Sequence, residues 1–422
     1  MSTDRSISLH VPRLALWILG FLLLAPWLIF GTWLLLAPRA GLPPARPPAA
    51  PPAATTPSPT APSDLLRCKP GPWGELVYYR SLIEPPEEFI LTDYTGVDPL
   101  PWVFKGYTPE KLAALWTAAG LTAAQREQLD DPTRRQADAE AIVLRPRTDA
   151  IIALTPASRA VIYSALADFS ENFAQFNPYR LRQDFAADWF DGADLPAPAV
   201  ALTKQMLYTR GATTCFSDYQ IVLSTLTSPA ERSRYVKTLS RKSALVVQLV
   251  VRPGSDIQPV DRYWSRGRRS KDITPLLQSL ARRPNGGSID IIHLLPPFAR
   301  AHLYTYPLPS ERPADATHDC HWSSFNFFKD VPDRRFDSID YTREVLLNDY
   351  YPVFGEPVLG DILMLMRKDG TVVHSCVYVA DDIVFTKNGP AFSVPWLLSP
   401  LDSVVAFYGS GHPLDIRRYR AK

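Results

Sequence analysis

A long uncharged run near the N-terminus constrains this chain more than any other feature of its sequence. No charged residue occurs from Leu14 to Ala37, and the run is rich in Leu, Trp, Ile and Phe. At about 1.5 Å of rise per residue, a helix of this length spans the roughly 30 Å hydrocarbon core of a bilayer. A cleaved signal peptide has a shorter apolar stretch of about 7–15 residues. The sequence therefore predicts an uncleaved transmembrane anchor over residues 14–37, preceded by a tail over residues 1–13.

A proline-rich segment follows the predicted anchor. Residues 38–64 are dominated by Pro, Ala and Thr, a composition that stays extended and acts as a spacer. Arginines lie on both sides of the apolar run, so the positive-inside rule does not fix its orientation. A spacer of this kind suits an exported domain that reaches toward a cell wall, although a cytoplasmic stalk has the same composition. We expect a single-pass cell-membrane protein whose C-terminal part is extracytoplasmic, on the periplasmic side.

The rest of the chain is long enough for two folded regions. It belongs to a sequence of 422 residues that is 46% hydrophobic, which allows a sizeable core. The formal net charge is +2, so no global field attracts nucleic acid, and the basic run at 266–271 is expected to be a solvated loop. A disulfide scaffold uses more cysteines than the four present, which are Cys68, Cys215, Cys320 and Cys376.

The region from 65 to 309 is predicted to be a mainly helical domain whose role the sequence does not indicate. Helices are expected to begin at Thr108–Pro109, Thr155–Pro156 and Ser228–Pro229, because a proline at the first helical position is typical of a helix start. Residues 243–251 form a short apolar run that fits either a buried strand or a helix continuation. No phosphate-binding loop or metal motif is recognisable in this region.

The last hundred residues have a different pattern. Residues 320–328 carry apolar side chains at helical spacing. Strands are expected at 361–366, 371–380, 383–386 and 404–408, with turns at 367–370 and 381–382, since Asp-Gly is a strong hairpin signal. A helix followed by an antiparallel meander is an α+β domain.

This region also places a thiol and an imidazole where they can react together. Asp319 is a good N-cap, which positions Cys320 in the first turn of its helix. The positive end of the helix dipole favours a thiolate there, and the Cys320 amide is free to bind an oxyanion. His374, near the start of a strand, can act as the base. We therefore predict that Cys320 is a nucleophile and that His374 takes its proton.

A third group is expected to orient the imidazole through its other ring nitrogen. A two-residue turn at 381–382 brings Lys387 onto the strand face of His374, whereas a three-residue turn brings Thr386 and Asn388 there. An Asn side chain can accept a hydrogen bond from imidazole and a Lys cannot. Asn388 is therefore the predicted third residue, and Thr386 is the second choice.

Other interpretations of these residues remain open. Cys320 also fits a small buried hydrophobic residue, and Cys376 fits one better still because its neighbours are apolar. Five soft or borderline ligands form two clusters that allow a zinc interpretation, but their spacing matches no common zinc pattern: His318, Cys320, His321, His374 and Cys376. We expect no metal and no cofactor.

Three short motifs in this order resemble the cell-wall cysteine peptidases of the NlpC and CHAP type, which are compact bacterial relatives of papain. The motifs are Asp319–Cys320, Gly360–Asp361 and His374–Ser375, and the match covers about residues 314–408. The resemblance implies a papain-like cysteine hydrolase domain over residues 310–422 that cleaves peptide or amide bonds, with peptidoglycan stem peptides as its substrate. Residues 384–389 resemble the strand in which CHAP domains place an orienting Asn, and this resemblance supports Asn388 as the third residue.

The chain also departs from the NlpC pattern. His321–Trp322 follows the cysteine where NlpC enzymes have Ser-Gly, and no histidine lies near Thr386. The bond that is cleaved therefore stays open. The alternative is a catalytically inactive papain-fold protein that serves as an interaction scaffold at the cell envelope.

Overall fold

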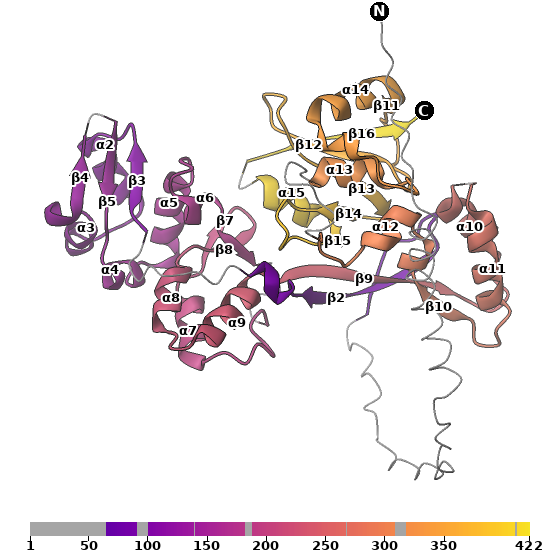
Figure 1. Cartoon of the computed structure of the whole chain (residues 1–422), viewed down its shortest axis with the longest axis horizontal. Coiled ribbons are helices and arrows are strands. Elements are labelled where there is room, and N and C mark those ends of the chain that lie inside the picture. Colours follow the sequence, from indigo (N-terminus) through magenta and orange to yellow (C-terminus); the bar gives the residue numbers. More distant parts are fainter. Residues whose placement is uncertain are drawn as a thin grey trace, which may run out of the picture. The chain divides into compact units, whose positions relative to one another are not determined.

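The computed structural model describes most of the chain after the proline-rich segment, namely residues 65–90, 100–138, 140–181, 188–266, 268–308, 318–409 and 412–422. The predicted tail, anchor and spacer over residues 1–64 lie outside the described residues. Among those that are described, no helix is both long enough and apolar enough to cross a membrane. They form an α+β fold, as predicted, and the sheets in Figure 1 are antiparallel.

Two long strands form the centre of the largest sheet in the region from 65 to 309. β2 (Glu75–Ile83) and β9 (Lys242–Val251) pair along their length, from Glu75 opposite Val250 to Ile83 opposite Lys242. The apolar run at 243–251 is therefore a strand. Two shorter strands, β1 (Leu66–Arg67) and β10 (Gly287–Asp290), complete a sheet with the order β1-β2-β9-β10.

The same region contains two small sheets that the sequence did not indicate. One has the order β3-β5-β4 and the other β6-β8-β7. Their strands are β3 (Trp102–Lys105), β4 (Arg135–Ala137), β5 (Ala141–Leu144), β6 (Tyr179–Leu181), β7 (Tyr208–Arg210) and β8 (Thr213–Phe216). The prediction of a mainly helical domain omitted them because strands of three or four residues are too short to show an alternating pattern.

Helices surround these sheets. The three predicted helix starts are confirmed, because the side chains of Thr108, Thr155 and Ser228 accept hydrogen bonds from backbone amides in the first turn. The helices are α2 (Pro109–Ala118), α3 (Ala123–Leu129), α4 (Thr148–Ile152), α5 (Pro156–Leu166), α6 (Phe173–Phe176), α7 (Ala197–Gln205), α8 (Tyr219–Thr225), α9 (Pro229–Leu239), α10 (Gln258–Ser265), α11 (Ser270–Ala281) and α12 (Pro297–His302).

The C-terminal region is built on a six-stranded sheet with the order β11-β16-β12-β13-β14-β15. Its strands are β11 (Tyr350–Pro352), β12 (Ile362–Met366), β13 (Val372–Ala380), β14 (Ile383–Lys387), β15 (Trp396–Pro400) and β16 (Asp415–Ala421), and its helices are α13 (Cys320–Asn326), α14 (Ile339–Asp349) and α15 (Leu401–Gly409). The predicted helix at 320 and the three central strands are confirmed. The predicted strand at 404–408 is wrong: it belongs to α15, because a short apolar run does not distinguish a strand from a helix.

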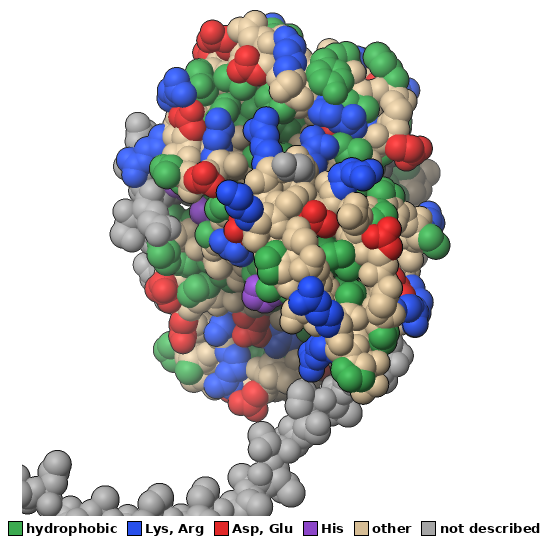
Figure 2. Space-filling view, turned by 90° about the vertical axis from the view of Figure 1, so that its right-hand side faces the viewer, with side chains coloured by type: hydrophobic (Ala, Val, Ile, Leu, Met, Phe, Trp, Pro, Cys, Tyr) green, Lys and Arg blue, Asp and Glu red, His purple; other side chains and the backbone are tan. Residues whose placement is uncertain are grey.

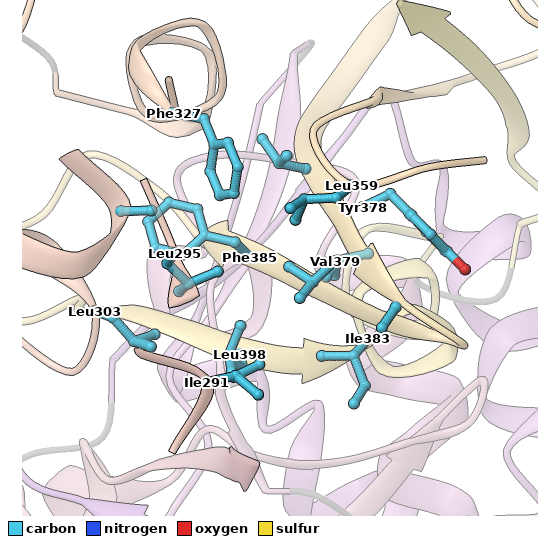
Figure 3. Close-up of a cluster of buried hydrophobic side chains, with 14 of the residues drawn as sticks. Ile291, Leu295, Leu303, Phe327, Leu359, Tyr378, Val379, Ile383, Phe385 and Leu398 are labelled. Atoms are coloured by element: carbon cyan, nitrogen blue, oxygen red, sulfur yellow. The ribbon is translucent and has the colours of Figure 1, made fainter. Parts of the chain in front are cut away.

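One face of the central strands forms the core beneath α13. Val379, Phe385 and Leu398 come from three neighbouring strands and are at most 1% exposed. Figure 3 shows them gathered with Leu295 and Phe327, which precede and follow α13 in the chain. The indole nitrogen of Trp396 also donates to the Ser323 hydroxyl over 2.7 Å, so α13 is fixed to this face by both apolar packing and a hydrogen bond.

The Gly360–Asp361 motif has a structural role in this fold. Gly360 has a φ of +90°, and a Cβ atom there would lie 2.0 Å from the Phe328 ring, so only glycine fits. The fully buried Asp361 carboxylate accepts bonds from Nε and Nη2 of Arg420, each over 2.7 Å, and from the Val358 amide over 2.9 Å. The motif therefore fixes the start of β12 to β16.

Candidate functional site

Cys320 is the first residue of α13, as predicted. The Asp319 side chain caps this helix by accepting hydrogen bonds from the amides of His321 and Trp322 over 2.9 and 3.0 Å. The Cys320 side chain faces β13 and is 8% exposed. Ser375, the neighbour of His374 on β13, lies beside the thiol. Hydrogen bonding from the Ser375 backbone and hydroxyl favours the thiolate form of Cys320. The fold thus brings the helix start to the strand that carries the predicted base.

The charge state of the thiol differs from the prediction. Burial, and then the negative charge of Asp319, raise the pKa of Cys320 to about 12. The helix N-terminus and Ser375 act in the opposite direction, but they do not offset the loss of solvation. The expectation of a thiolate is therefore not met, and Cys320 is a neutral thiol at pH 7.

His374 is fully buried and is held by a relay of two side chains. Its Nε2 lies 2.8 Å from Oγ1 of Thr386, and Thr386 Oγ1 donates to Oδ1 of Asn388 over 2.9 Å. Since the hydroxyl proton is directed at Asn388, Thr386 accepts the hydrogen bond from Nε2–H of His374. The other ring nitrogen, Nδ1, then carries the lone pair, and it has no hydrogen-bond partner among the described residues.

The register of β13 and β14 explains why Thr386 and Asn388 share the face of His374. Ala380 lies opposite Ile383, which leaves a two-residue turn, but the register then shifts and Tyr378 lies opposite Val384. The extra residue in β13 is a bulge, and it moves every later pair by one position. Thr386, predicted second, contacts the ring, and Asn388, predicted first, acts on it through Thr386.

Two further side chains near His374 were not assigned a catalytic role from the sequence. Tyr408 of α15 stacks on the imidazole, with ring centroids 4.1 Å apart. Its pKa is raised by burial and then by the charge of Cys320, so Tyr408 lies close to both predicted partners. The sequence pattern predicts a strand at 404–408, and for this reason the contact between Tyr408 and His374 was not expected.

His321 is the second of the two side chains near His374. Its Nδ1 lies 2.9 Å from the Ser375 hydroxyl, which donates onward to Ser324 over 3.1 Å. Burial lowers the pKa of His321. Burial and the nearby charge of His321 lower the pKa of His374 well below its usual value. Both imidazoles are therefore neutral at pH 7, and a neutral ring with a free Nδ1 lone pair can accept a proton.

The remaining candidate ligands do not gather into a metal site. In the described part of the chain, no group of three or more His, Cys, Asp or Glu side chains is placed to hold a metal ion. The ring of His318 instead stacks on Trp322, with centroids 3.9 Å apart. Cys376 is fully buried, and all four cysteines are free thiols.

A cleft of about 1500 Å³ adjoins the site. The C-terminal region contributes Val373, Asn388 and Tyr408 to its lining, and β6, β7 and β9 contribute further lining residues. Because Tyr408 covers the ring of His374, this tyrosine separates the imidazole from the cleft. Neither Cys320 nor His374 is among the described residues that line the cleft, which reaches the site at Tyr408.

No protein-family model, no curated protein and no solved structure matches this chain. What the structure defines is an α+β protein with antiparallel sheets. Its candidate site combines a neutral thiol at a helix start with a neutral, buried imidazole whose tautomer is fixed.

Proposed function

We propose that this protein is a membrane-anchored cysteine hydrolase that cleaves peptide or amide bonds, with peptidoglycan stem peptides as its substrate. The observation that carries the proposal is the free Nδ1 lone pair of His374, held by the Thr386–Asn388 relay on the strand that receives Cys320. A base for the thiol has to be neutral, oriented and unbonded at the accepting nitrogen. The resemblance of the three short motifs to NlpC and CHAP peptidases supports the choice of substrate.

In the proposed mechanism, the Cys320 sulfur attacks the carbonyl carbon while its proton moves to Nδ1 of His374. A C–S bond forms, and the Cys320 amide stabilises the oxyanion. The C–N bond then breaks as the imidazolium gives its proton to the leaving amine. Water attacks the thioester and passes a proton to Nδ1, and the departing sulfur takes that proton back. Because the resting thiol is protonated, proton transfer accompanies the attack.

The relay and the tyrosine have separate positioning roles in this mechanism. Thr386 keeps the proton on Nε2, so that Nδ1 stays available throughout. Tyr408 keeps water away from the imidazole and holds the plane of the ring. Neither side chain exchanges a proton with the substrate.

The proposed location follows from the sequence beyond the described residues. The predicted anchor at 14–37 and the predicted spacer at 38–64 support a location on the periplasmic side of the cell membrane, within reach of the wall. The face shown in Figure 2 gives no support to a nucleic-acid partner. On the face shown in Figure 2, Lys and Arg side chains are interspersed with acidic and apolar ones, whereas nucleic-acid binding uses a continuous basic patch.

The second candidate is a catalytically inactive papain-fold protein that acts as a scaffold at the envelope. It is favoured by the deep burial of Cys320, which raises the pKa of the thiol. The absence of the Ser-Gly that follows the cysteine in NlpC enzymes points the same way.

The two candidates differ in what the full-length protein does to purified sacculi. We expect the wild type to release soluble muropeptides, detected by liquid chromatography and mass spectrometry, and expect Cys320→Ala and His374→Gln to release none. Cys68→Ala is the matched control, since Cys68 is a free thiol that is only half-buried and lies outside the site. Release by Cys320→Ala at the wild-type rate contradicts the proposal, and no release by the wild type favours the scaffold.

A further inference from the structure

Three cationic side chains lie near one another in the cleft beside the site. Arg180 of β6, Arg210 of β7 and Lys242 at the start of β9 all line it. Arg180 lies opposite Cys215 and Arg210 lies opposite Thr213 on the shared neighbour β8. Positions two apart on a strand point to the same face. The two arginines therefore extend from one face of the small sheet into the cleft.

None of these cations is neutralised by a carboxylate within the described ranges. Arg180 donates to the Phe407 carbonyl over 2.9 Å, and Arg210 donates to the Gln175 carbonyl over 2.6 Å. The ion pairs formed by described side chains include neither arginine nor Lys242. Nε of Arg210 is also buried without a hydrogen-bond partner.

A cluster of three cations without a neighbouring counter-charge is electrostatically unfavourable. Burial lowers the pKa of Arg180, and the charge of Arg210 lowers it further. Burial, followed by the charge of Arg180, lowers the pKa of Lys242 to about 8. Like charges held close together in a partly desolvated cleft repel one another, and a bound anion removes that cost.

The cluster is linked directly to the wall of the candidate site. The Arg180 guanidinium lies over the Phe407 ring, 4.0 Å from its centroid. The next residue, Tyr408, stacks on His374. An anionic group bound at the cluster is thus separated from the imidazole by the side chains of two adjacent residues of α15.

We propose that Arg180, Arg210 and Lys242 form a subsite that binds a carboxylate of an acidic peptide substrate. The region from 65 to 309 then supplies substrate recognition, and the C-terminal region supplies the chemistry. Guanidinium groups match the geometry of a carboxylate. Calling the ligand a substrate rests on the proposed function, but binding at the subsite does not require hydrolysis.

The test uses full-length protein carrying Cys320→Ala, so that no result depends on cleavage. The probe is the acetylated dipeptide Ala-Glu with both carboxylates free, and its diamide is the uncharged control. Titration calorimetry is expected to detect the diacid and not the diamide. Lys242→Gln should weaken binding at least about tenfold, because it removes a charge from a desolvated contact, and Lys242→Arg should preserve binding. Lys271→Gln is the matched control, since Lys271 is exposed on α11.

The pH dependence adds a readout that a purely structural lysine does not give. The other charged or titratable side chains lining the cleft among the described residues are Asp168, Tyr179, Tyr219, Arg367, Asp402, Tyr408 and His412. Affinity is expected to fall as the pH rises through about 8, where Lys242 loses its proton, and the Lys242→Arg variant should not show this fall.

Three results overturn the subsite. They are equal affinity for the diacid and the diamide, unchanged affinity in Lys242→Gln, and equal displacement of the peptide by inorganic phosphate, which indicates a general anion site. Binding without any release from sacculi by the wild-type protein leaves the subsite standing and removes the hydrolase, so the two failures are distinguishable.

Discussion

The ring of Tyr408 lies nearly parallel to the ring of His374, with centroids 4.1 Å apart and planes inclined by 17°. One residue thereby buries the imidazole, separates it from the cleft and lies close to Cys320. The contact joins α15 to β13. In the chain, α15 follows directly after β15, and in the sheet β14 lies between β15 and β13. The protonation of His374 consequently depends on a residue that takes no part in proton transfer.

Removing the tyrosine ring should raise the pKa of His374. Burial is the main cause of its lowered pKa, and Tyr408→Ala admits water to the ring, which stabilises the imidazolium. Tyr408→Phe keeps the stacked ring and should leave the pKa low. Proton NMR of the imidazole C–H resonances over a pH series measures both. An unchanged pKa in Tyr408→Ala contradicts this role.

Thr386→Val should impair activity by fixing the wrong tautomer. The substitution keeps the shape but removes the acceptor for Nε2–H, which leaves a buried donor unsatisfied at a cost of about 1–3 kcal/mol. We expect release from sacculi to fall about tenfold to a hundredfold, and Thr386→Ser to retain most of it. Nitrogen-15 NMR of the His374 ring reports the tautomer independently of activity. Wild-type tautomer and rate in Thr386→Val would falsify the relay.

Alkylation of Cys320 should require alkaline pH in the free protein. The pKa of Cys320 is raised to about 12 by burial and by Asp319, above the value of about 8.5 for a solvated thiol. The rate of labelling by iodoacetamide, followed by mass spectrometry of the Cys320 peptide, is expected to keep rising above pH 9. A plateau below pH 8 shows a resting thiolate and contradicts the neutral thiol.

The protein should lose stability in mild acid through His374. Its folded pKa is lowered, so below about pH 6.5 the unfolded chain binds a proton that the native state does not. The free energy of unfolding then falls as the pH falls, by about 1.4 kcal/mol per pH unit for this one group. Urea unfolding should show a shallower acid dependence in His374→Gln. Identical pH dependence in the two proteins argues against a neutral buried imidazole.

Breaking the Asp361–Arg420 pair should destabilise the C-terminal sheet. Arg420→Met removes the partner of a carboxylate that is 0% exposed, and an unpaired buried charge costs about 3–5 kcal/mol. The double variant with Asp361→Asn should recover part of that loss, because no charge is then left buried. Urea denaturation of both variants measures the difference. A loss below about 1 kcal/mol in Arg420→Met shows that the pair contributes little.

The sequence predicted the central elements of the C-terminal region because their signals are local. An N-cap at Asp319 and the Asp-Gly hairpin signal at 369–370 both report the backbone around them. The small sheets around β5 and β8 were missed because strands of three or four residues are too short to show an alternating pattern. The apolar run in α15 carries no signal that separates a helix from a strand.

The candidate site was predictable in its residue types and less so in its contacts. Cys320 and His374 stand where the motifs place them, but a bulge near Val379 decides which residue reaches the ring. A turn length read from the sequence does not reveal a bulge. The ionisation of Cys320 also depends on burial, which arises from distant segments, and for this reason a helix N-terminus alone gave the wrong charge state.

The most direct test of the Cys320–His374 account is to trap the covalent intermediate. Full-length protein is mixed with sacculi, quenched in acid within the first turnover, digested and analysed by mass spectrometry. The account predicts a stem-peptide acyl group on the Cys320 peptide, removable by hydroxylamine, in the wild type and its absence in His374→Gln. Release of muropeptides with no acyl group on Cys320, or equal acylation in His374→Gln, contradicts it.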